Sequence, residues 1–248
     1  MTLLKIDKIS VPNRLKQITA SVDFGERIHL IGANGAGKSS LLNVLAAELS
    51  FSGDVFLNET SIRHYKYNDL SRIQGFVIQQ SEALPFMPVF HYLSLFHQLS
   101  EMNSKQLNIL FYDFQIDKLL SKNIQHLSGG EWQRVRIVAV FIQLWAGDDL
   151  KGKLMLLDEP MNNLDIVQLT ILDKWLDKFC QLGGSIMMST HDLRHSYLKA
   201  SKVWLISEGI LIGSGTTEIL LDENLISTTF NTEIKCQNIT NKVDWQVI

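Results

Sequence analysis

The chain has 248 residues, a formal net charge of −3 and two distant cysteines, Cys180 and Cys236, which form neither a metal nor a redox motif. This length is enough for one large domain with a sizeable core, and the lack of basic stripes excludes an extended nucleic-acid surface. We find no cleavable apolar signal at the start and no apolar run near the roughly 20 residues that span a bilayer. We therefore expect a soluble globular protein in a reducing compartment, held by a partner wherever it works at a membrane.

The first third of the chain predicts several strands and one helix. Apolar and polar residues alternate across residues 3–31, which is typical of strands, and residues 27–31 are apolar enough for a buried strand. A helix is expected over residues 39–47, directly after a glycine-rich turn. Two further short strands are expected over residues 54–58 and 74–78.

The middle of the chain has a different pattern. Between residues 81 and 145, apolar side chains recur every three or four positions, which predicts mostly helices. Pro85 and Pro88 interrupt the first part of this stretch and predict a loop there. The polar residues 146–152 then lead back to strand-forming sequence. This order predicts a mostly helical insertion within an α/β core.

Strands and helices alternate again in the last third of the chain. Residues 154–157 and 185–189 are short and apolar, as buried strands are, and the amphipathic residues 165–182 between them predict a helix. Residues 203–212 indicate a hairpin, and the tail beyond about residue 214 is weakly patterned. Because strands alternate with helices through most of the core, we expect a largely parallel sheet.

A glycine-rich loop joins the buried strand at 27–31 to the helix that follows. Its sequence fits G-x-x-x-x-G-K-[ST], the phosphate-binding loop. The glycines allow successive N–H groups to point at an anion, and the helix N-terminus adds a partial positive charge. Lys38 would reach the β- and γ-phosphates, and the Ser39 hydroxyl would bind Mg²⁺. The predicted nucleotide-binding residues are Gly32, Ala33, Asn34, Gly35, Ala36, Gly37, Lys38, Ser39 and Ser40.

Two carboxylates follow the buried strand at 154–157. In a parallel sheet, ligands bind beyond the carboxyl ends of the strands. Asp158 would hold Mg²⁺ through water, and Glu159 would orient and polarise the water that attacks the γ-phosphate. An isolated Asp-Glu-Pro more often starts a turn or a helix, so this interpretation depends on the phosphate loop upstream.

A second glycine pair precedes a helix that we expect to run to about Trp145. Ser128 can cap this helix, and Gly129 and Gly130 leave backbone N–H groups open at its positive end. The stretch from Ser128 to Glu131 is therefore a second candidate anion site. Because the first loop already holds the phosphates, we expect a second copy of the chain to supply one of the two sites.

Over nearly its whole length, the chain resembles the nucleotide-binding subunits of ATP-binding cassette (ABC) transporters. Leu-Ser-Gly-Gly-Glu at 127–131 and Leu-Leu-Asp-Glu-Pro at 156–160 carry the resemblance, together with the phosphate loop. It implies a single α/β domain, with a P-loop NTPase core, a mostly parallel sheet and an N-terminal antiparallel β subdomain. The core would comprise residues 1–80 and 151–248, and the helical insertion about 81–150.

The resemblance also implies an ATPase in which two subunits pack head to tail and sandwich ATP and Mg²⁺. Each phosphate loop would face the signature stretch of the partner, here Ser128, Gly129, Gly130 and Glu131.

Further positions match the family's functional residues. Gln79 lies where the family has a lid glutamine that binds Mg²⁺ and water and senses nucleotide, and His191 matches a switch histidine that contacts the γ-phosphate. Residues 163–165 match the loop that links the two sites. The expected catalytic residues are Glu159, His191 and Gln79, and the expected Mg²⁺ ligands are Ser39, Gln79 and Asp158.

One departure from the family concerns adenine. The family usually stacks the base on an aromatic side chain near the N-terminus, but residues 11–14 contain none. Adenine would then be held by apolar packing or by stacking on Arg14.

Three stretches resemble the ATPase subunits of bacterial vitamin B12 importers more narrowly. They are residues 88–93, 128–136 and 158–165, in which Trp132 and Met161 are the residues that are unusual for the wider family. This resemblance implies coupling of ATP hydrolysis to cobalamin transport, at the cytoplasmic face of the inner membrane. The implied partners are a second copy, two membrane-spanning permease subunits and, indirectly, a periplasmic binding protein.

Other functions stay open as alternatives. Importers of iron-siderophore or haem use a similar subunit. A soluble ABC ATPase of translation or DNA repair is disfavoured by the single cassette and the lack of sustained heptads. A binding switch without turnover is disfavoured by Glu159.

The segment from Gln79 to Leu95 is dense in apolar and aromatic residues beside prolines in the predicted loop. These residues either pack the insertion onto the core or form a groove for a short cytoplasmic helix of the membrane subunit. The set comprises Leu84, Pro85, Phe86, Met87, Phe90 and Tyr92.

Overall fold

The computed structural model describes residues 1–79, 84, 86–97, 101–239 and 242–248. Its centre is a six-stranded sheet with the strand order β10-β9-β3-β8-β7-β6. All neighbours from β9 to β6 are parallel, and only the edge strand β10 is antiparallel to its neighbour. The strands are β3 (Arg27–Ile31), β6 (Gln74–Val77), β7 (Leu154–Leu157), β8 (Ser185–Thr190), β9 (Lys202–Ser207) and β10 (Ile210–Gly215).

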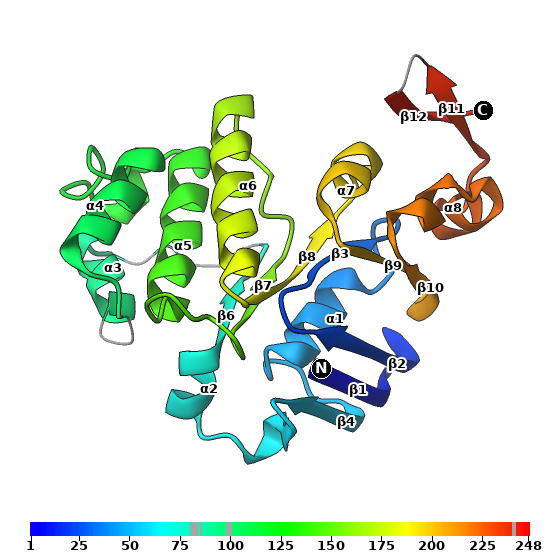
Figure 1. Cartoon of the computed structure of the whole chain (residues 1–248), viewed down its shortest axis with the longest axis horizontal. Helices are drawn as coiled ribbons and strands as arrows, with labels where there is room; N and C mark the ends of the chain where they lie inside the picture. The colour runs from blue at the N-terminus through cyan, green and yellow to red at the C-terminus, as the bar shows by residue number, and fades with distance from the viewer. Residues whose placement is uncertain (80–83, 85, 98–100, 240–241) are drawn as a thin grey trace.

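The N-terminal segment forms a separate antiparallel sheet with the order β2-β1-β4-β5. Its strands are β1 (Thr2–Val11), β2 (Leu15–Asp23), β4 (Ser52–Leu57) and β5 (Thr60–Ser61). Helix α1 (Lys38–Leu45) lies between the two sheets, and its buried Leu41 and Leu45 share one hydrophobic cluster with Ile6 of β1 and Leu30 of β3 (Figure 1). This packing fixes the phosphate loop at the start of α1.

Helices of the insertion gather at one end of the molecule (Figure 1). They are α3 (Val89–His97), α4 (Ser104–Asp113) and α5 (Gly129–Leu144), and α6 (Ile166–Gln181) packs beside them. Phe141 of α5 contacts the rings of Phe114, Trp175 and Phe179, so α5 and α6 share one aromatic core. The short α2 (Tyr67–Ile73) precedes β6.

The C-terminal part lies at the opposite end of the molecule (Figure 1). It contains α7 (Leu193–Lys199), α8 (Glu223–Phe230) and a hairpin of β11 (Ile234–Ile239) and β12 (Lys242–Val247). Trp245 anchors the hairpin, because its Nε1 donates to the carbonyl of Leu220 and its ring packs on Tyr197. The weakly patterned tail is therefore ordered by contacts that are distant in sequence.

The structure confirms the predicted α/β fold class, with its mostly parallel sheet and its antiparallel N-terminal sheet. The expected loop around Phe90 and Tyr92 is wrong, since α3 already begins at Val89, directly after Pro88. Proline at a helix start removes no intrahelical hydrogen bond, which explains the early onset. The predicted division of the chain at 80/81, like Pro85, lies outside the described residues.

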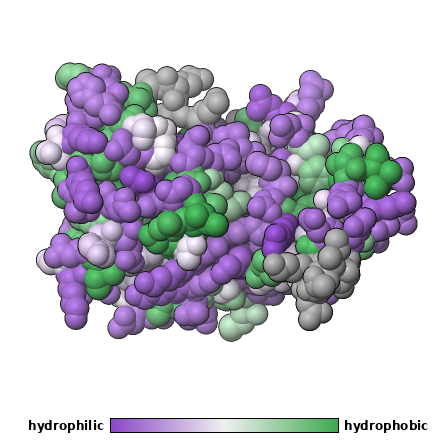
Figure 2. Space-filling view, turned by 90° about the horizontal axis from the view of Figure 1, so that it is seen from above, coloured by the Kyte–Doolittle hydropathy of each residue, from purple (hydrophilic) through white to green (hydrophobic). Residues whose placement is uncertain are grey.

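The surface is mostly polar. Figure 2 shows mainly hydrophilic residues on the face seen from above, with separate hydrophobic groups between them. Within the described residues, no helix is both long and apolar enough to cross a bilayer.

Candidate functional site

The predicted site residues follow four neighbouring strands of the central sheet at the same edge. Gly32 comes directly after β3, His191 after β8, Asp158 after β7, and Gln79 two residues after β6. Because these strands are parallel, their carboxyl ends meet at one edge, where ligands bind in such sheets. The topology thus brings together segments that are far apart in the sequence.

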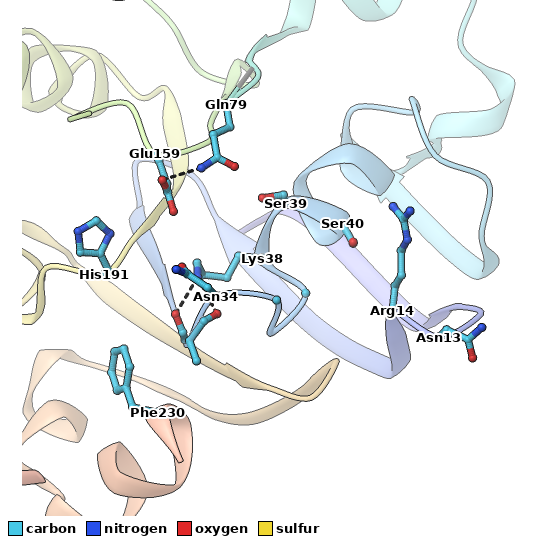
Figure 3. Close-up of a pocket in the computed structure, with 14 residues that line it drawn as sticks. Asn13, Arg14, Asn34, Lys38, Ser39, Ser40, Gln79, Glu159, His191 and Phe230 are labelled. Carbon is cyan, nitrogen blue, oxygen red and sulfur yellow. Dashed lines mark hydrogen bonds between the residues drawn. The ribbon is translucent and has the colours of Figure 1, made fainter. Parts of the chain in front are cut away.

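A cavity of about 780 Å³ opens at this edge (Figure 3). Its volume suits a ligand of nucleotide size. The lining residues come from the phosphate loop, the ends of β6, β7 and β8, the β1–β2 turn and α8. They are Asn13, Arg14, Gly32, Ala33, Asn34, Gly35, Gly37, Lys38, Ser39, Ser40, Gln79, Glu159, His191 and Phe230.

The phosphate loop has the tight backbone that its glycines allow. A Cβ atom at Gly32 would lie 2.2 Å from the carbonyl oxygen of Ile206, so only glycine fits there. Gly37 has a φ of 112° at the N-cap of α1, in the left-handed region that glycine tolerates. The loop therefore presents its backbone and the α1 N-terminus to the cavity.

Lys38 is the buried cation of this loop, with 6% of its surface exposed. Its Nζ donates to the carbonyls of Gly32 at 2.7 Å and Ala33 at 3.0 Å. Burial lowers the pKa of Lys38, and the carboxylates of Glu159 and Asp158 offset this in part. A partly desolvated ammonium attracts a phosphate more strongly than one in water does.

The two carboxylates after β7 have different environments. Asp158 is 1% exposed, and one of its oxygens accepts from the Ser189 hydroxyl at 2.5 Å. Glu159 has a left-handed φ of 47°, and its N–H donates to Ser189 Oγ at 2.8 Å. This backbone turns Glu159 into the cavity while Asp158 stays behind it.

Two amide side chains hold the Glu159 carboxylate. Gln79 Nε2 donates to Oε2 at 2.8 Å (Figure 3), and Asn162 Nδ2 donates to the same oxygen at 2.6 Å. We predicted Gln79 from the sequence but not Asn162. A Glu-Pro-x-Asn sequence carries no local signal that the amide turns back onto the glutamate.

The signature stretch lies outside this cavity. Ser128 accepts from the Glu131 N–H at 3.2 Å, while the Glu131 carboxylate accepts from the Ser128 N–H at 2.8 Å, a capping box that starts α5. The hydrogen bond from the Ser128 N–H and the nearby Lys122 lower the pKa of Glu131. A Cβ at Gly130 would lie 2.5 Å from the carbonyl oxygen of Asn163, so this glycine permits a close approach within the chain.

The two ends of the cavity differ in character. Arg14 and Asn13 lie at one end, near Ser40, and Phe230 lies at the other, beyond Asn34 (Figure 3). We considered Arg14 from the sequence, but Phe230 was missed. It comes from α8 in the weakly patterned tail, and only the tertiary fold brings its ring to the phosphate loop.

Comparison with known proteins identifies the family. The ABC transporter family model matches residues 15–162. The chain belongs to the ABC transporter family. This membership confirms the resemblance seen in the motifs and identifies the chain as an ATP-binding, ATP-hydrolysing transporter subunit.

Two relatives that share one name match nearly the whole chain. The "Vitamin B12 import ATP-binding protein BtuD" of Photorhabdus laumondii subsp. laumondii is 44% identical, over 99% of this chain and 97% of that protein. The protein of that name from Yersinia pseudotuberculosis is 40% identical, over 99% of this chain and 98% of its own length.

Solved structures of ABC transporter subunits show the same fold. An ATP-binding subunit superposes with a TM-score of 0.78 at 23% identity, over 88% of this chain and 91% of that chain. The ADP conformation of MJ1267, an ATP-binding cassette, superposes with a TM-score of 0.71 at 19% identity, over 92% and 98%.

Proposed function

We propose that this chain is the ATP-hydrolysing subunit of a vitamin B12 importer and couples ATP binding and hydrolysis to transport across the inner membrane. The observation that carries the ATPase role is that Lys38 and Glu159, from different strand ends, face one cavity of nucleotide size. The cargo rests on the 44% identity to a vitamin B12 import protein over almost the full chain.

Each residue at the cavity has a distinct task in this proposal. Lys38 and the backbone N–H groups of residues 32–40 bind the phosphates. Glu159 orients and polarises the attacking water, with its carboxylate positioned by Gln79 and Asn162. His191, which is exposed and lines the cavity, contacts the γ-phosphate.

The residues at the cavity fit a magnesium ion bound together with ATP. Mg²⁺ prefers oxygen ligands and usually takes few from the protein when it also binds phosphates. Gln79 uses its amide nitrogen on Glu159, so its Oε1 stays available, and Ser39 adds a hydroxyl. Asp158 lies behind the cavity, and its second oxygen, beside the one bonded to Ser189, would hold the ion through water. When bound, the ion would neutralise charge on the β- and γ-phosphates.

A second copy of the chain would complete the site. Ser128, Gly129, Gly130 and Glu131 form the open N-terminus of α5, yet they do not line the cavity of their own chain. In a head-to-tail pair, this N-terminus would face the γ-phosphate bound to the other copy.

The exposed aromatic residues near α3 support docking onto two membrane-spanning permease subunits. Phe86 is 80% exposed and Phe90 is 57% exposed, so neither serves mainly to pack the insertion. Tyr92, from the same segment, is half-buried against Trp132. The permease pair would hold the chain at the cytoplasmic face of the inner membrane and connect it to a periplasmic binding protein.

Transport by the reconstituted system tests this function. The chain is assembled with its permease subunits in vesicles, with the binding protein on the other side, and uptake of labelled cobalamin is measured with ATP. We expect uptake that needs ATP, Mg²⁺ and Glu159. Uptake of an iron-siderophore complex or haem in place of cobalamin would contradict the cargo, and uptake that is normal in Glu159→Gln would contradict the mechanism.

A further inference from the structure

Two side chains in the first turns of α5 reach the backbone next to Gln79 and Glu159. Gln133 is 3% exposed, and its Nε2 donates to the carbonyl of Pro160 at 3.0 Å. Arg136, one helical turn later, donates through Nη1 to the carbonyl of Ile78 and through Nη2 to Gln133 Oε1. The signature helix is thus bonded to two loops that belong to the core.

These bonds close a ring through the candidate catalytic residues. Ile78 directly precedes Gln79, and Pro160 directly follows Glu159. Gln79 in turn donates to the Glu159 carboxylate at 2.8 Å. A shift of α5 would therefore move the backbone next to Gln79 through Ile78 and the backbone next to Glu159 through Pro160.

The chemistry of Arg136 suits a bridging role. Its side chain is half-buried, and desolvation lowers its pKa. The acceptors that it contacts in the described part of the chain are the uncharged oxygens of Ile78 and Gln133. Its guanidinium also lies 5.9 Å from the ring centroid of Trp132, within the range of a cation–π contact. The N–H groups of a planar guanidinium form a rigid fork that is set in advance to bridge two acceptors, whereas those of an ammonium rotate.

We propose that Gln133 and Arg136 are positioning residues that couple the place of the α5 N-terminus to the geometry of Gln79 and Glu159. This inference rests on the proposed function, in which the α5 N-terminus of one copy meets the nucleotide of the other. Docking of that nucleotide would fix α5, and the ring would then fix the glutamate that acts in the same chain.

A purely structural role makes a different prediction, and Gln143 supplies the matched control. Gln143 lies on the same helix, is 8% exposed and donates through Nε2 to the carbonyls of Ser71 at 2.7 Å and Gln74 at 3.0 Å. It is a buried glutamine with the same chemistry, away from the catalytic loops. Gln143→Met should cost stability much as Gln133→Met does.

The test compares Gln133→Met, Arg136→Met and the double variant with Gln143→Met in the assembled transporter. We expect kcat for ATP to fall by roughly 10- to 100-fold in either ring variant, because small misplacements of a catalytic group cost about that much. The affinity of the isolated subunit for a fluorescent ATP analogue should stay unchanged. The double variant should lose no more kcat than the more affected single variant, because either substitution alone already interrupts the ring of hydrogen bonds.

Two results would overturn the inference. One is a kcat of Gln133→Met equal to that of Gln143→Met at equal melting temperature, and the other is additive losses in the double variant. If the methionine variants do not fold, Gln133→Glu keeps the acceptor for Arg136 but loses the donor to Pro160, and wild-type kcat in that variant counts against the ring. Normal hydrolysis in Glu159→Gln would instead contradict the proposed function. Failure of the inference and failure of the proposed function are therefore distinguishable.

Discussion

Glu159 combines a left-handed backbone with two amide donors on one carboxylate oxygen. Its φ of 47° is uncommon for a residue with a Cβ atom, and such strain concentrates at functional sites. Gln79 and Asn162 both donate to Oε2, and neither bond involves Oε1. The side chain is thereby oriented without being covered, as a group that activates water must be.

Replacement of this carboxylate by an amide separates binding from chemistry. Glu159→Gln keeps the shape but removes the charge that polarises water, so ATP should still bind while hydrolysis falls by roughly 10²–10⁴-fold. ATP that is not hydrolysed should hold two copies together, so gel filtration with ATP and Mg²⁺ should show a stable dimer. A variant that hydrolyses ATP like the wild type would remove Glu159 from its assigned role.

Lys38 gives a second prediction at the same scale. Lys38→Ala removes the cation of the phosphate loop. Because a hydrogen bond to a charged group contributes about 1.5–3 kcal/mol, ATP affinity should fall roughly ten- to a hundred-fold. Hydrolysis should be lost. Equilibrium binding and turnover of the purified variant check this, beside a melting curve, because Gly32 and Ala33 lose the donor to their carbonyls. Wild-type turnover would refute the assignment.

The helix α5 carries a prediction at the scale of one element. Ser128→Arg places a long side chain at the helix N-terminus, where the partner's γ-phosphate is expected. Binding of ATP to the single subunit should survive, because Ser128 does not line its own cavity, whereas dimer closure and hydrolysis should fail. ATP binding to the monomer and sedimentation with ATP measure the two effects separately.

The control for this variant is Ser128→Ala, which loses the cap on the Glu131 N–H but adds no bulk. Loss of a cap costs about 1 kcal/mol of stability, so both variants should melt somewhat lower. Gly130→Asp is less suitable, since its Cβ would meet the Asn163 carbonyl within the same chain. If Ser128→Arg abolished ATP binding to the monomer, the signature would act within one chain and the head-to-tail arrangement would be wrong.

The start of α3 carries the prediction for the membrane partner. Phe86→Ser or Phe90→Ser should leave folding and ATP affinity of the isolated subunit near normal, because both rings are largely exposed. The complex with the permease should loosen, and transport should uncouple from hydrolysis. Pull-down with the permease and cobalamin uptake measure these effects.

Tyr112→Ser is the matched control, since Tyr112 is an aromatic residue on α4 that is 78% exposed. It should change neither assembly nor transport. Intact assembly in a folded Phe86→Ser variant would rule out the groove, and a large drop in melting temperature would favour internal packing instead.

At the scale of the whole molecule, much of the architecture follows from local sequence. The apolar runs that form β3, β7 and β8 are buried at every residue, and each is followed by a motif whose chemistry needs a strand end. Parallel order then puts the motifs at one edge. Ser128 also starts its helix as its capping chemistry predicts.

The parts that were missed depend on contacts between distant segments. Phe230 reaches the cavity only because α8 packs against β9 and β10, and the hairpin β11–β12 is fixed by Trp245 on Tyr197 and Leu220. Asn162 bonds to Glu159 because the backbone turns at a left-handed residue. No local period or motif in the sequence encodes these arrangements.

A buried polar cluster links β3 to α6 and α7 and makes the stability of the whole fold depend on pH. Arg27 bonds to Asp173 at 2.6 Å, and its Nε donates to His29 Nε2 at 3.2 Å. The other ring nitrogen of His29 lies 2.9 Å from Ser196 Oγ. Because His29 Nε2 accepts from Arg27, the ring is neutral. Burial, with the charges of Arg27 and His195, lowers the pKa of His29 well below its ordinary value, and Asp173 opposes this only in part.

The sign of the effect follows from proton counting. Below pH about 6.5, His29 takes up a proton in the unfolded chain but not in the folded one. The contribution of His29 to the free energy of unfolding is therefore complete above that pH and decreases as the pH falls below it. The expected slope from this residue is about 1.4 kcal/mol per pH unit. Urea unfolding at a series of pH values from neutral to acid measures this slope. The free energy of unfolding should change less with pH in His29→Gln, because glutamine stays neutral. Equal slopes in both proteins would contradict a neutral buried His29.

The position of Ser128 outside its own cavity has a kinetic consequence. If each cavity lacks a wall that only another copy provides, the free subunit in dilute solution has bound nucleotide but no complete site. Its rate of hydrolysis per molecule should then rise in proportion to protein concentration until most chains are paired, and should fade on dilution. A permease that holds two copies side by side, as proposed above, would remove this dependence. Activity would then be confined to the membrane assembly, and stray subunits would consume little ATP.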